Sequence, residues 1–351
     1  IGGHGPSPEP EHFFGKTLAD AIVIGEGEET IVDLLGAIGN KETLKGIPGI
    51  AYREGTEVTI NNRRTLIKDI DSIPFPAYSL FPMEFYRLMR MPHATNTDFV
   101  LPILSGRGCT FNCSFCYRMD EGFRPRSCES IIEEVNLIKR DYGITYVAFG
   151  DELLMSSVKR TASLCEAIIK ADLNVKWECN GRLNYAKPDV LKLMKKAGCV
   201  FINYGIEAMD DNVLKNMKKG LTTPVIIEGI KNTLAIGISP GFNIIFGNIG
   251  DNKATLEKGV ELLLKYDDGS QLRTIRPVTP YPGSALYYYA IENGMMKDCE
   301  DFYENKHANS DLLAVNFTEL SDDQFHQCLL EANSRLITNY FTKKLNNSLD
   351  I

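Results

Sequence analysis

Short apolar runs alternate with longer amphipathic stretches from residue 99 onward. The strand-like runs are Phe99–Leu104, Thr145–Phe149, Val175–Cys179, Val200–Tyr204, Gly241–Phe246 and Leu272–Val278. The stretches between them have helical spacing and recognisable ends: Ser127 and Thr223 each open one, Pro188 leads another, and Gly237 closes one. Alternating strands and helices specify a parallel sheet with crossover helices. The pattern therefore predicts an α/β fold whose six strands form a partial (β/α)6 parallel barrel.

The first hundred residues have a different pattern of apolar runs, turns and prolines. Ala21–Ile24 reads as a strand and Glu28–Ile38 as an amphipathic helix. Gly49–Ile60 has two β-prone runs around Glu54-Gly55, which predicts a hairpin. Asp69–Pro82 is interrupted by prolines, which fit neither a helix interior nor a central strand. We expect this segment to be an extended linker that lies over a surface.

Two helices are predicted near the carboxyl end. Tyr281–Ala285 has the composition of a helix start, and Ser321–Gln324 has the form of a capping box. The helix after the capping box carries apolar residues at helical spacing, namely Phe325, Leu329, Leu336 and Tyr340. We interpret this helix as a packing element.

Composition sets wide bounds on function. The chain has 351 residues, 44% of them hydrophobic, and can bury one large core or two unequal ones. Its formal charge of -8 argues against a general binder of nucleic-acid phosphates, which needs Lys and Arg. We find no apolar run near the ~20 residues of a membrane helix and no signal segment at the start. The chain begins with Ile1 rather than Met, so we expect a fragment or a missing start.

Three cysteines lie close together directly after the first predicted barrel strand. Cys109, Cys113 and Cys116 have the spacing Cys-x-x-x-Cys-x-x-Cys. A cubic iron–sulfur cluster normally takes four cysteines, so three leave one iron open for a small molecule. The alternative is a zinc site with Cys128 as fourth ligand, although zinc sites usually show paired cysteines or matching histidines. The other six cysteines are scattered, which favours a reducing, cytoplasmic location.

The cysteine loop, with Phe115 just before its third cysteine, resembles that of the radical S-adenosylmethionine (SAM) enzymes. The resemblance implies that the three cysteines hold a [4Fe–4S] cluster and that SAM binds its open iron. One electron from the cluster then cleaves SAM to methionine and a 5′-deoxyadenosyl radical, which removes hydrogen from an unactivated carbon. The expected partners are a small-molecule substrate and a reductant such as flavodoxin or ferredoxin, with no nucleic acid.

Side chains at the carboxyl ends of the strands are expected to face one common mouth. Gly150-Asp151-Glu152 resembles the family motif that holds the amino group of SAM, with Asp151 in place of its second glycine. By the same resemblance, Arg182 pairs with the SAM carboxylate through its planar fork. The alternative for Gly150-Asp151-Glu152 is a common turn without a role in binding. The alternative for Arg182 is a surface ion pair with Glu178.

The remaining SAM contacts are implied on three further strands. Asn180 or Glu207 is expected to bond the ribose hydroxyls. Ile245 lies in a stretch that resembles the family's adenine shelf, although Asn243 replaces the first glycine of that motif. The alternative for Ile245 is ordinary barrel core.

Residues 1–46 resemble the closing third of the Rossmann-like cobalamin-binding domain found in one branch of the family. Gly2 and Gly3 match its glycine loop near the nucleotide tail, and Gly25–Glu29 matches its Gly-Glu-x-Glu turn. The resemblance implies cobalamin in the full-length protein, with methylation or rearrangement of an unactivated carbon. Any βα unit with a glycine turn is the alternative. His4 is not expected to be a cobalt ligand.

These readings give four sequence regions. They are a cobalamin-domain remnant (1–46), a hairpin and proline-rich linker (47–98), a radical SAM partial barrel (99–295) and a helical extension (296–351). Two other function classes stay open. A methylthiotransferase-like RNA modifier shares the barrel but brings a second three-cysteine domain and a basic tail, and neither is visible here. A non-catalytic iron–sulfur or zinc binding module would bind metal without turning SAM over.

Overall fold

The structure is a computed structural model that describes residues 1–349. It has two compact units, each built from separate stretches of chain. Ile1–Ile73, Ser114–Gly122 and Thr279–Val315 form the first, here called the N-terminal unit. Pro74–Cys113, Phe123–Val278 and the chain from Asn316 form the second, the barrel unit. The sequence boundaries at 46, 98 and 295 stay predictions, since the two units interleave along the chain.

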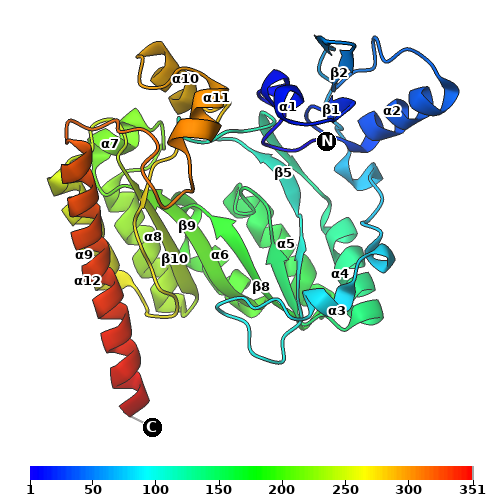
Figure 1. The fold of residues 1–351 in the computed structure, drawn as a ribbon. Helices are drawn as coiled ribbons and strands as arrows, with labels where there is room; N and C mark the ends of the chain where they lie inside the picture. Colours follow the sequence, from blue (N-terminus) through cyan, green and yellow to red (C-terminus); the bar gives the residue numbers. More distant parts are fainter. Residues whose placement is uncertain (350–351) are drawn as a thin grey trace. The chain divides into compact units, whose positions relative to one another are not determined.

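A six-stranded parallel sheet is the centre of the barrel unit (Figure 1). Its strand order is β11-β10-β9-β8-β7-β4, which runs in chain order from one edge to the other. The strands are β4 (Val100–Ile103), β7 (Tyr146–Phe149), β8 (Lys176–Gly181), β9 (Cys199–Glu207), β10 (Ser239–Phe246) and β11 (Arg276–Pro277). The predicted partial parallel barrel is confirmed.

Helices follow the strands and cover one face of this sheet (Figure 1). They are α4 (Cys128–Tyr142), α5 (Val158–Lys170), α6 (Pro188–Lys196), α7 (Asp211–Asn216), α8 (Thr223–Ile236) and α9 (Lys253–Tyr266). The predicted ends are confirmed. The Ser127 hydroxyl accepts from the Ser130 N–H at 3.0 Å, and Gly237 ends α8 with a φ of 73°.

The last helix, α12 (Asp322–Leu349), begins with the predicted capping box. Ser321 N–H donates to Gln324 Oε1 at 3.1 Å, and Gln324 N–H donates to Ser321 Oγ at 3.3 Å. Asn333 on this helix bonds both the N–H and the C=O of Ile275. The prediction of a strand over Leu272–Val278 is therefore too long: a side chain takes the main-chain bonds of Ile275, and β11 pairs with β10 only at Arg276–Pro277.

The cysteine loop lies between two short strands, β5 (Gly106–Cys109) and β6 (Gly122–Pro125), which pair with each other. Gly106 has no room for a side chain, because a Cβ there would lie 2.6 Å from the ring of Phe123. Gly106, three residues before the first cysteine, is thus required by the close approach of these strands.

The proline-rich segment joins the two units. It carries two single 3₁₀ turns, η1 (Ile70–Ser72) and η2 (Tyr78–Leu80), followed by the short helix α3 (Met83–Tyr86). Within the barrel unit, the buried Tyr78 hydroxyl donates to Glu134 on α4 at 2.6 Å. From Tyr78 onward, the predicted linker therefore lies on the barrel unit, held there by a buried hydrogen bond.

The N-terminal unit contains a small antiparallel sheet in the order β1-β2-β3. Its strands are β1 (Ala21–Val23), β2 (Ile50–Glu54) and β3 (Glu57–Ile60), and its helices are α1 (Pro10–Lys16), α2 (Glu28–Asn40), α10 (Ala285–Glu292) and α11 (Cys299–Asp301), with the π-helix η4 (Phe302–Lys306). The strand predicted at Ala21–Ile24, the helix predicted at Glu28–Ile38 and the predicted hairpin are confirmed as β1, α2 and β2–β3. Helix α1 was not predicted; its one proline, Pro10, stands at the helix start, where proline is tolerated.

Candidate cluster and cofactor site

The first two predicted cluster ligands belong to the barrel unit. Cys109 ends β5 and is half-buried, Cys113 is buried, and neither forms a disulfide. The N–H of Phe111 donates to the Cys109 sulfur, while burial raises the pKa of that thiol. Backbone N–H groups aimed at cysteine sulfurs are among the features that tune iron–sulfur clusters. The loop therefore offers thiol ligands with a hydrogen bond already in place.

The third predicted ligand, Cys116, is exposed and belongs to the N-terminal unit. Its segment is anchored within that unit, where Ser114 C=O accepts from Leu286 N–H at 2.8 Å. Tyr117 packs so closely on Gly283 that a Cβ there would lie 2.6 Å from the tyrosine ring. The half-buried Phe115 lies in the same segment.

No group of three or more Cys, His, Asp or Glu side chains within residues 1–349 is arranged to hold a metal ion. A structural zinc ion needs its ligands gathered around one point at about 2.0–2.3 Å. A cubic cluster needs each cysteine on a different iron, which keeps the sulfurs apart. Three cysteines within one short loop are the donor set that a cubic cluster with one open iron needs.

Arg182 lies beside the cysteine loop. It follows β8, is 5% exposed, and its guanidinium carbon is 3.4 Å from the ring centroid of Phe111. It also donates to the Cys113 sulfur and to the main-chain oxygen of Lys219. A cation stacked on an aromatic ring is strongest when both are out of water. The structure therefore places Arg182 against the loop that carries the predicted ligands.

Glu207, at the end of β9, forms a buried ion pair. Its carboxylate lies 2.8 Å from the Lys219 ammonium, and the two residues are 8% and 6% exposed. Its φ of 68° is in the left-handed region, an uncommon conformation that local structure must hold in place. Gly205 makes room for the pair, because a Cβ there would lie 2.3 Å from the Glu207 carboxylate. Lys219 thus joins Arg182 and Glu207, two predicted SAM ligands.

The departure of Asp151 from the family motif has a structural reason. This carboxyl group is 1% exposed and accepts from the N–H of Ser105 at 2.9 Å and from its hydroxyl at 3.0 Å. Burial raises the pKa of Asp151 to about 6. Ser105 immediately precedes β5, so the carboxyl group ties the turn after β7 to the start of the cysteine strand. Glu152, the next residue, is close enough to Cys109 to interact electrostatically.

The other predicted residues lie as follows. Gly150 N–H donates to Ile103 C=O at 2.9 Å, which holds the turn against β4. Asn180 on β8 donates to Asp151 C=O at 2.8 Å. Ile245 on β10 is half-buried. In the N-terminal unit, Gly2 pairs with Val23 and Gly3 has a φ of 100°.

Sequence reasoning missed Phe111, Ser105 and Lys219. Phe111 sits inside the cysteine loop, so its place could have drawn attention to it. Lys219 lies in the pair Lys218-Lys219 before Gly220, and lysines in such a pattern are usually exposed to solvent. No sequence signal marks it as buried.

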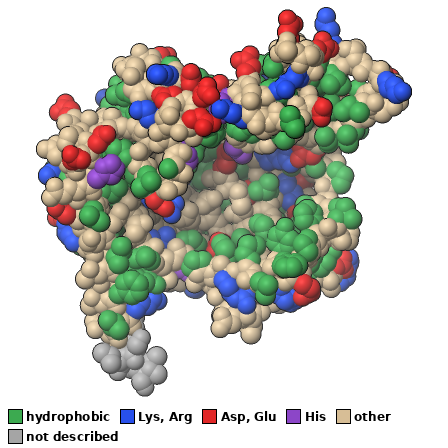
Figure 2. Space-filling view, viewed as in Figure 1, with side chains coloured by type: hydrophobic (Ala, Val, Ile, Leu, Met, Phe, Trp, Pro, Cys, Tyr) green, Lys and Arg blue, Asp and Glu red, His purple; other side chains and the backbone are tan. Residues whose placement is uncertain are grey.

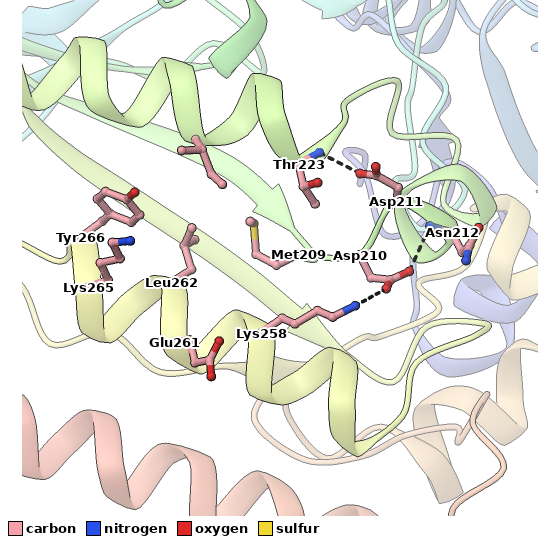
Figure 3. Close-up of a pocket in the computed structure, with 11 residues that line it drawn as sticks. Met209, Asp210, Asp211, Asn212, Thr223, Lys258, Glu261, Leu262, Lys265 and Tyr266 are labelled. Atoms are coloured by element: carbon pink, nitrogen blue, oxygen red, sulfur yellow. Dashed lines mark hydrogen bonds and ion pairs between the residues drawn. The ribbon is translucent and has the colours of Figure 1, made fainter.

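The face of the sheet that the helices leave free lies behind a hollow in the space-filling view (Figure 2, compare Figure 1). A separate pocket of about 480 Å³ lies between α8 and α9 (Figure 3). There Lys258 donates to Asp210 at 2.7 Å and Thr223 N–H donates to Asp211 at 2.7 Å. Its lining includes none of the predicted cluster or SAM residues, so we do not assign the cofactor site to it.

Residues 103–263 match the family model described as the Radical SAM superfamily. This part of the chain, which holds the three cysteines and most of the sheet, is therefore a radical SAM domain. A domain of this superfamily implies a [4Fe–4S] cluster and SAM as cofactors.

Two curated relatives show the range of similar proteins. An uncharacterized methyltransferase of Pyrococcus horikoshii is 32% identical over 280 residues, which is 79% of this chain and 59% of that protein. The anaerobic magnesium-protoporphyrin IX monomethyl ester cyclase of Cereibacter sphaeroides is 28% identical over 277 residues, 76% of this chain and 44% of that protein. The chain spans about half the length of these relatives.

A solved structure has the same fold. The radical SAM methyltransferase TsrM from Kitasatospora setae, solved with cobalamin and a [4Fe–4S] cluster bound, superimposes with a TM-score of 0.73. It is 17% identical, and the match covers 95% of this chain and 71% of TsrM.

Proposed function

We propose that the protein is a radical SAM enzyme that modifies an unactivated carbon, with methylation or rearrangement assisted by cobalamin. The observation that carries the proposal is the position of the cysteine loop. Phe111, which lies between Cys109 and Cys113 in the loop, stacks on Arg182 at 3.4 Å, and the Asp151 carboxyl group bonds Ser105 just before β5. Asp151 and Arg182 follow the carboxyl ends of the parallel strands β7 and β8. This is where such sheets collect their chemistry.

The residues have separable roles in this proposal. Cys109, Cys113 and Cys116 hold the cluster, which when bound supplies the electron that cleaves SAM. The turn at Gly150–Glu152 accepts hydrogen bonds from the SAM amino group, and Arg182 attracts its carboxylate. Ile245 offers an apolar surface for adenine. The Arg182–Phe111 stack keeps water from one side of the loop, which strengthens the electrostatic contacts made there.

Cobalamin is proposed for the full-length protein rather than for residues 1–351 alone. Gly2 and Gly3 at the start of the chain support it, with the strand and helix that follow. Helix α2 exposes Ile31, Val32, Leu35 and Ile38 on the side that does not pack on the small sheet. An apolar face of this kind usually marks a contact with another part of the protein, and the remainder of a cobalamin-binding domain is the proposed cover.

The proposed partners are a small-molecule substrate and a one-electron protein reductant such as flavodoxin or ferredoxin. None of the helices within residues 1–349 has the length and apolar character needed to cross a bilayer. We propose a cytoplasmic location from the free cysteines and the oxygen sensitivity expected of an open iron.

The direct test of the cluster is anaerobic reconstitution with iron and sulfide. We expect about four irons per chain and a broad visible absorbance, both lost when Cys109, Cys113 and Cys116 are all changed to Ala. A matched control changes Cys165, Cys299 and Cys328, which are also free but lie far from the loop in sequence, and should keep the iron. Protein that takes up stoichiometric zinc and no iron contradicts the proposal.

A further inference from the structure

Three asparagines on neighbouring strands form a continuous row of side-chain amides. They are Asn180 on β8, Asn203 on β9 and Asn243 on β10. Asn243 Nδ2 donates to Asn203 Oδ1 at 3.1 Å, and Asn203 Nδ2 donates to Asn180 Oδ1 at 3.1 Å. We call this row the amide ladder.

The amide ladder ends on the turn that follows β7. Asn180 Nδ2 donates to the main-chain oxygen of Asp151 at 2.8 Å. All three bonds therefore run in one direction, from β10 toward the turn, and amides bonded in this way polarise and strengthen one another. The Asp151 carboxyl group is held separately by Ser105, so this residue is fixed at both its side chain and its main chain.

The ladder lies on the face of the sheet that the helices leave free. The strand neighbours of the three asparagines are buried: Cys179, Gly181, Ile202, Tyr204, Phe242 and Ile244. Because side chains alternate along a strand, the asparagines point to the opposite face. Asn180 and Asn203 are partly buried and Asn243 is exposed, so the row leads from the open face to the turn.

The need of polar side chains for hydrogen-bond partners does not by itself explain this row. Asparagine is disfavoured in strands, and Asn243 is exposed, where water can satisfy its amide. Asn243 also stands where the family motif has glycine. Within the described part of the chain, the Asn203 side chain bonds only to the side chains of Asn180 and Asn243, so its amide acts on the rest of the protein through them.

We propose that the amide ladder is a positioning device for the Gly150–Glu152 turn, and that Asn203 sets how tightly this turn binds the SAM amino group. The inference rests on the proposed function, because it takes this turn as part of the SAM site. It adds Asn203, to which we assign no contact with the cluster or with SAM. Asn203 orients Asn180, Asn180 holds the Asp151 carbonyl, and the turn keeps the geometry that its acceptors need.

The test compares SAM affinities of reconstituted chains, followed by the SAM-induced change in the electron paramagnetic resonance (EPR) spectrum of the reduced cluster. Asn203→Leu should weaken SAM binding several-fold, with a smaller loss for Asn243→Gly, because Asn243 is one step further from the turn. Iron content should be unchanged in both variants. In a Glu152→Ala background, Asn203→Leu should have a much smaller effect, since both act through one turn.

Asn203→Asp separates the hydrogen bond from packing. This variant keeps the size and the oxygen that accepts from Asn243, but it cannot donate to Asn180, so it should weaken SAM binding as Asn203→Leu does. It also carries the test if the leucine variant fails to fold. The matched control is Asn216→Leu, which removes an amide bonded to Ile249 C=O outside the ladder and should leave SAM affinity unchanged.

Wild-type affinity in both Asn203 variants, with full iron, would overturn the ladder proposal. An equal loss in the Asn216 control would also overturn it, because the effect would then be general destabilisation. Wild-type protein that holds the cluster but binds no SAM overturns the proposed function itself, and the two failures are thereby distinguished.

Discussion

Asp151 shows how a single residue can replace a family glycine and keep the turn in place. Its carboxyl group is enclosed and takes two hydrogen bonds from Ser105, which tie the turn to the strand that leads to Cys109. Arg182 contacts the same loop through Phe111 and Cys113. Neither arrangement could be predicted from the sequence, because both depend on strands that are distant in the chain.

Asp151 should make stability depend on pH. Burial raises its pKa in the folded protein to about 6, from an ordinary value of 3.8. The folded state therefore binds this proton more tightly than the unfolded state, and stability should fall as pH rises from about 4 to about 6. Asp151→Asn keeps an oxygen for the Ser105 N–H and removes the charge. Relative to the wild type, this variant should gain stability across that range, on the order of 2 kcal/mol.

Urea unfolding of both proteins at pH 4.5 and pH 7.5 measures this difference. Asp141→Asn is the control, because this aspartate is exposed and pairs with Arg140 at the surface. A wild-type and Asp151→Asn difference that does not change between the two pH values would show that Asp151 titrates normally.

Glu152 and Arg182 are the two side chains that we expect to contribute most to SAM binding. Glu152→Ala and Arg182→Ala should each weaken SAM binding and leave iron content intact, because neither residue is a cluster ligand. Equilibrium binding of SAM and iron analysis on the same samples give the two quantities, with Arg140→Ala as an exposed control. Loss of iron in Arg182→Ala would instead mean that its stack on Phe111 is needed to fold the cysteine loop.

At the scale of elements, the sequence predicted what local signals determine. The six strands follow from alternation, and Ser127, Gly237 and Ser321 lie at helix ends where the structure has them. The missed or shortened elements depend on distant contacts. The sixth strand begins only at Arg276, because Asn333 takes the main-chain bonds of Ile275 just before it. No sequence pattern near residue 275 indicates a side chain 58 positions away.

The capping box of α12 should contribute measurably to the stability of the protein. Ser321→Ala removes the hydroxyl that accepts from Gln324 N–H, which should lower stability by about 1 kcal/mol. The midpoint of thermal unfolding, compared between the reconstituted variant and the wild type, measures this loss of stability. Ser334→Ala on an exposed turn of the same helix should have little effect or a slight gain. Equal midpoints for Ser321→Ala and wild type would show that the start of α12 is held by packing alone.

At the scale of the molecule, the sequence predicted the barrel but not how the chain divides between two compact units. The cysteine loop itself is divided, with Cys109 and Cys113 in one unit and Cys116 in the other. Hydrophobic patterning reports on faces of single elements, and it does not say which separate stretches gather into one core.

Cobalamin binding should depend on parts of the protein outside residues 1–351. The full-length protein, purified with cobalamin supplied, should carry it, and residues 1–351 alone should bind it poorly. His4→Ala in the full-length protein should leave the cobalamin absorbance spectrum nearly unchanged, because we assign His4 no bond to cobalt. Full-length protein that carries no cobalamin would leave a radical SAM enzyme without the second cofactor.

The central claim is that this chain cleaves SAM by one-electron chemistry at the cluster held by its cysteine loop. The most direct measurement is the formation of 5′-deoxyadenosine by anaerobically reconstituted protein with SAM and a strong reductant, without substrate. We expect slow formation that needs the reductant and is absent from the variant with Cys109, Cys113 and Cys116 changed to Ala. A full cluster that binds SAM, yet yields no 5′-deoxyadenosine above that variant under any reducing condition, would contradict the account.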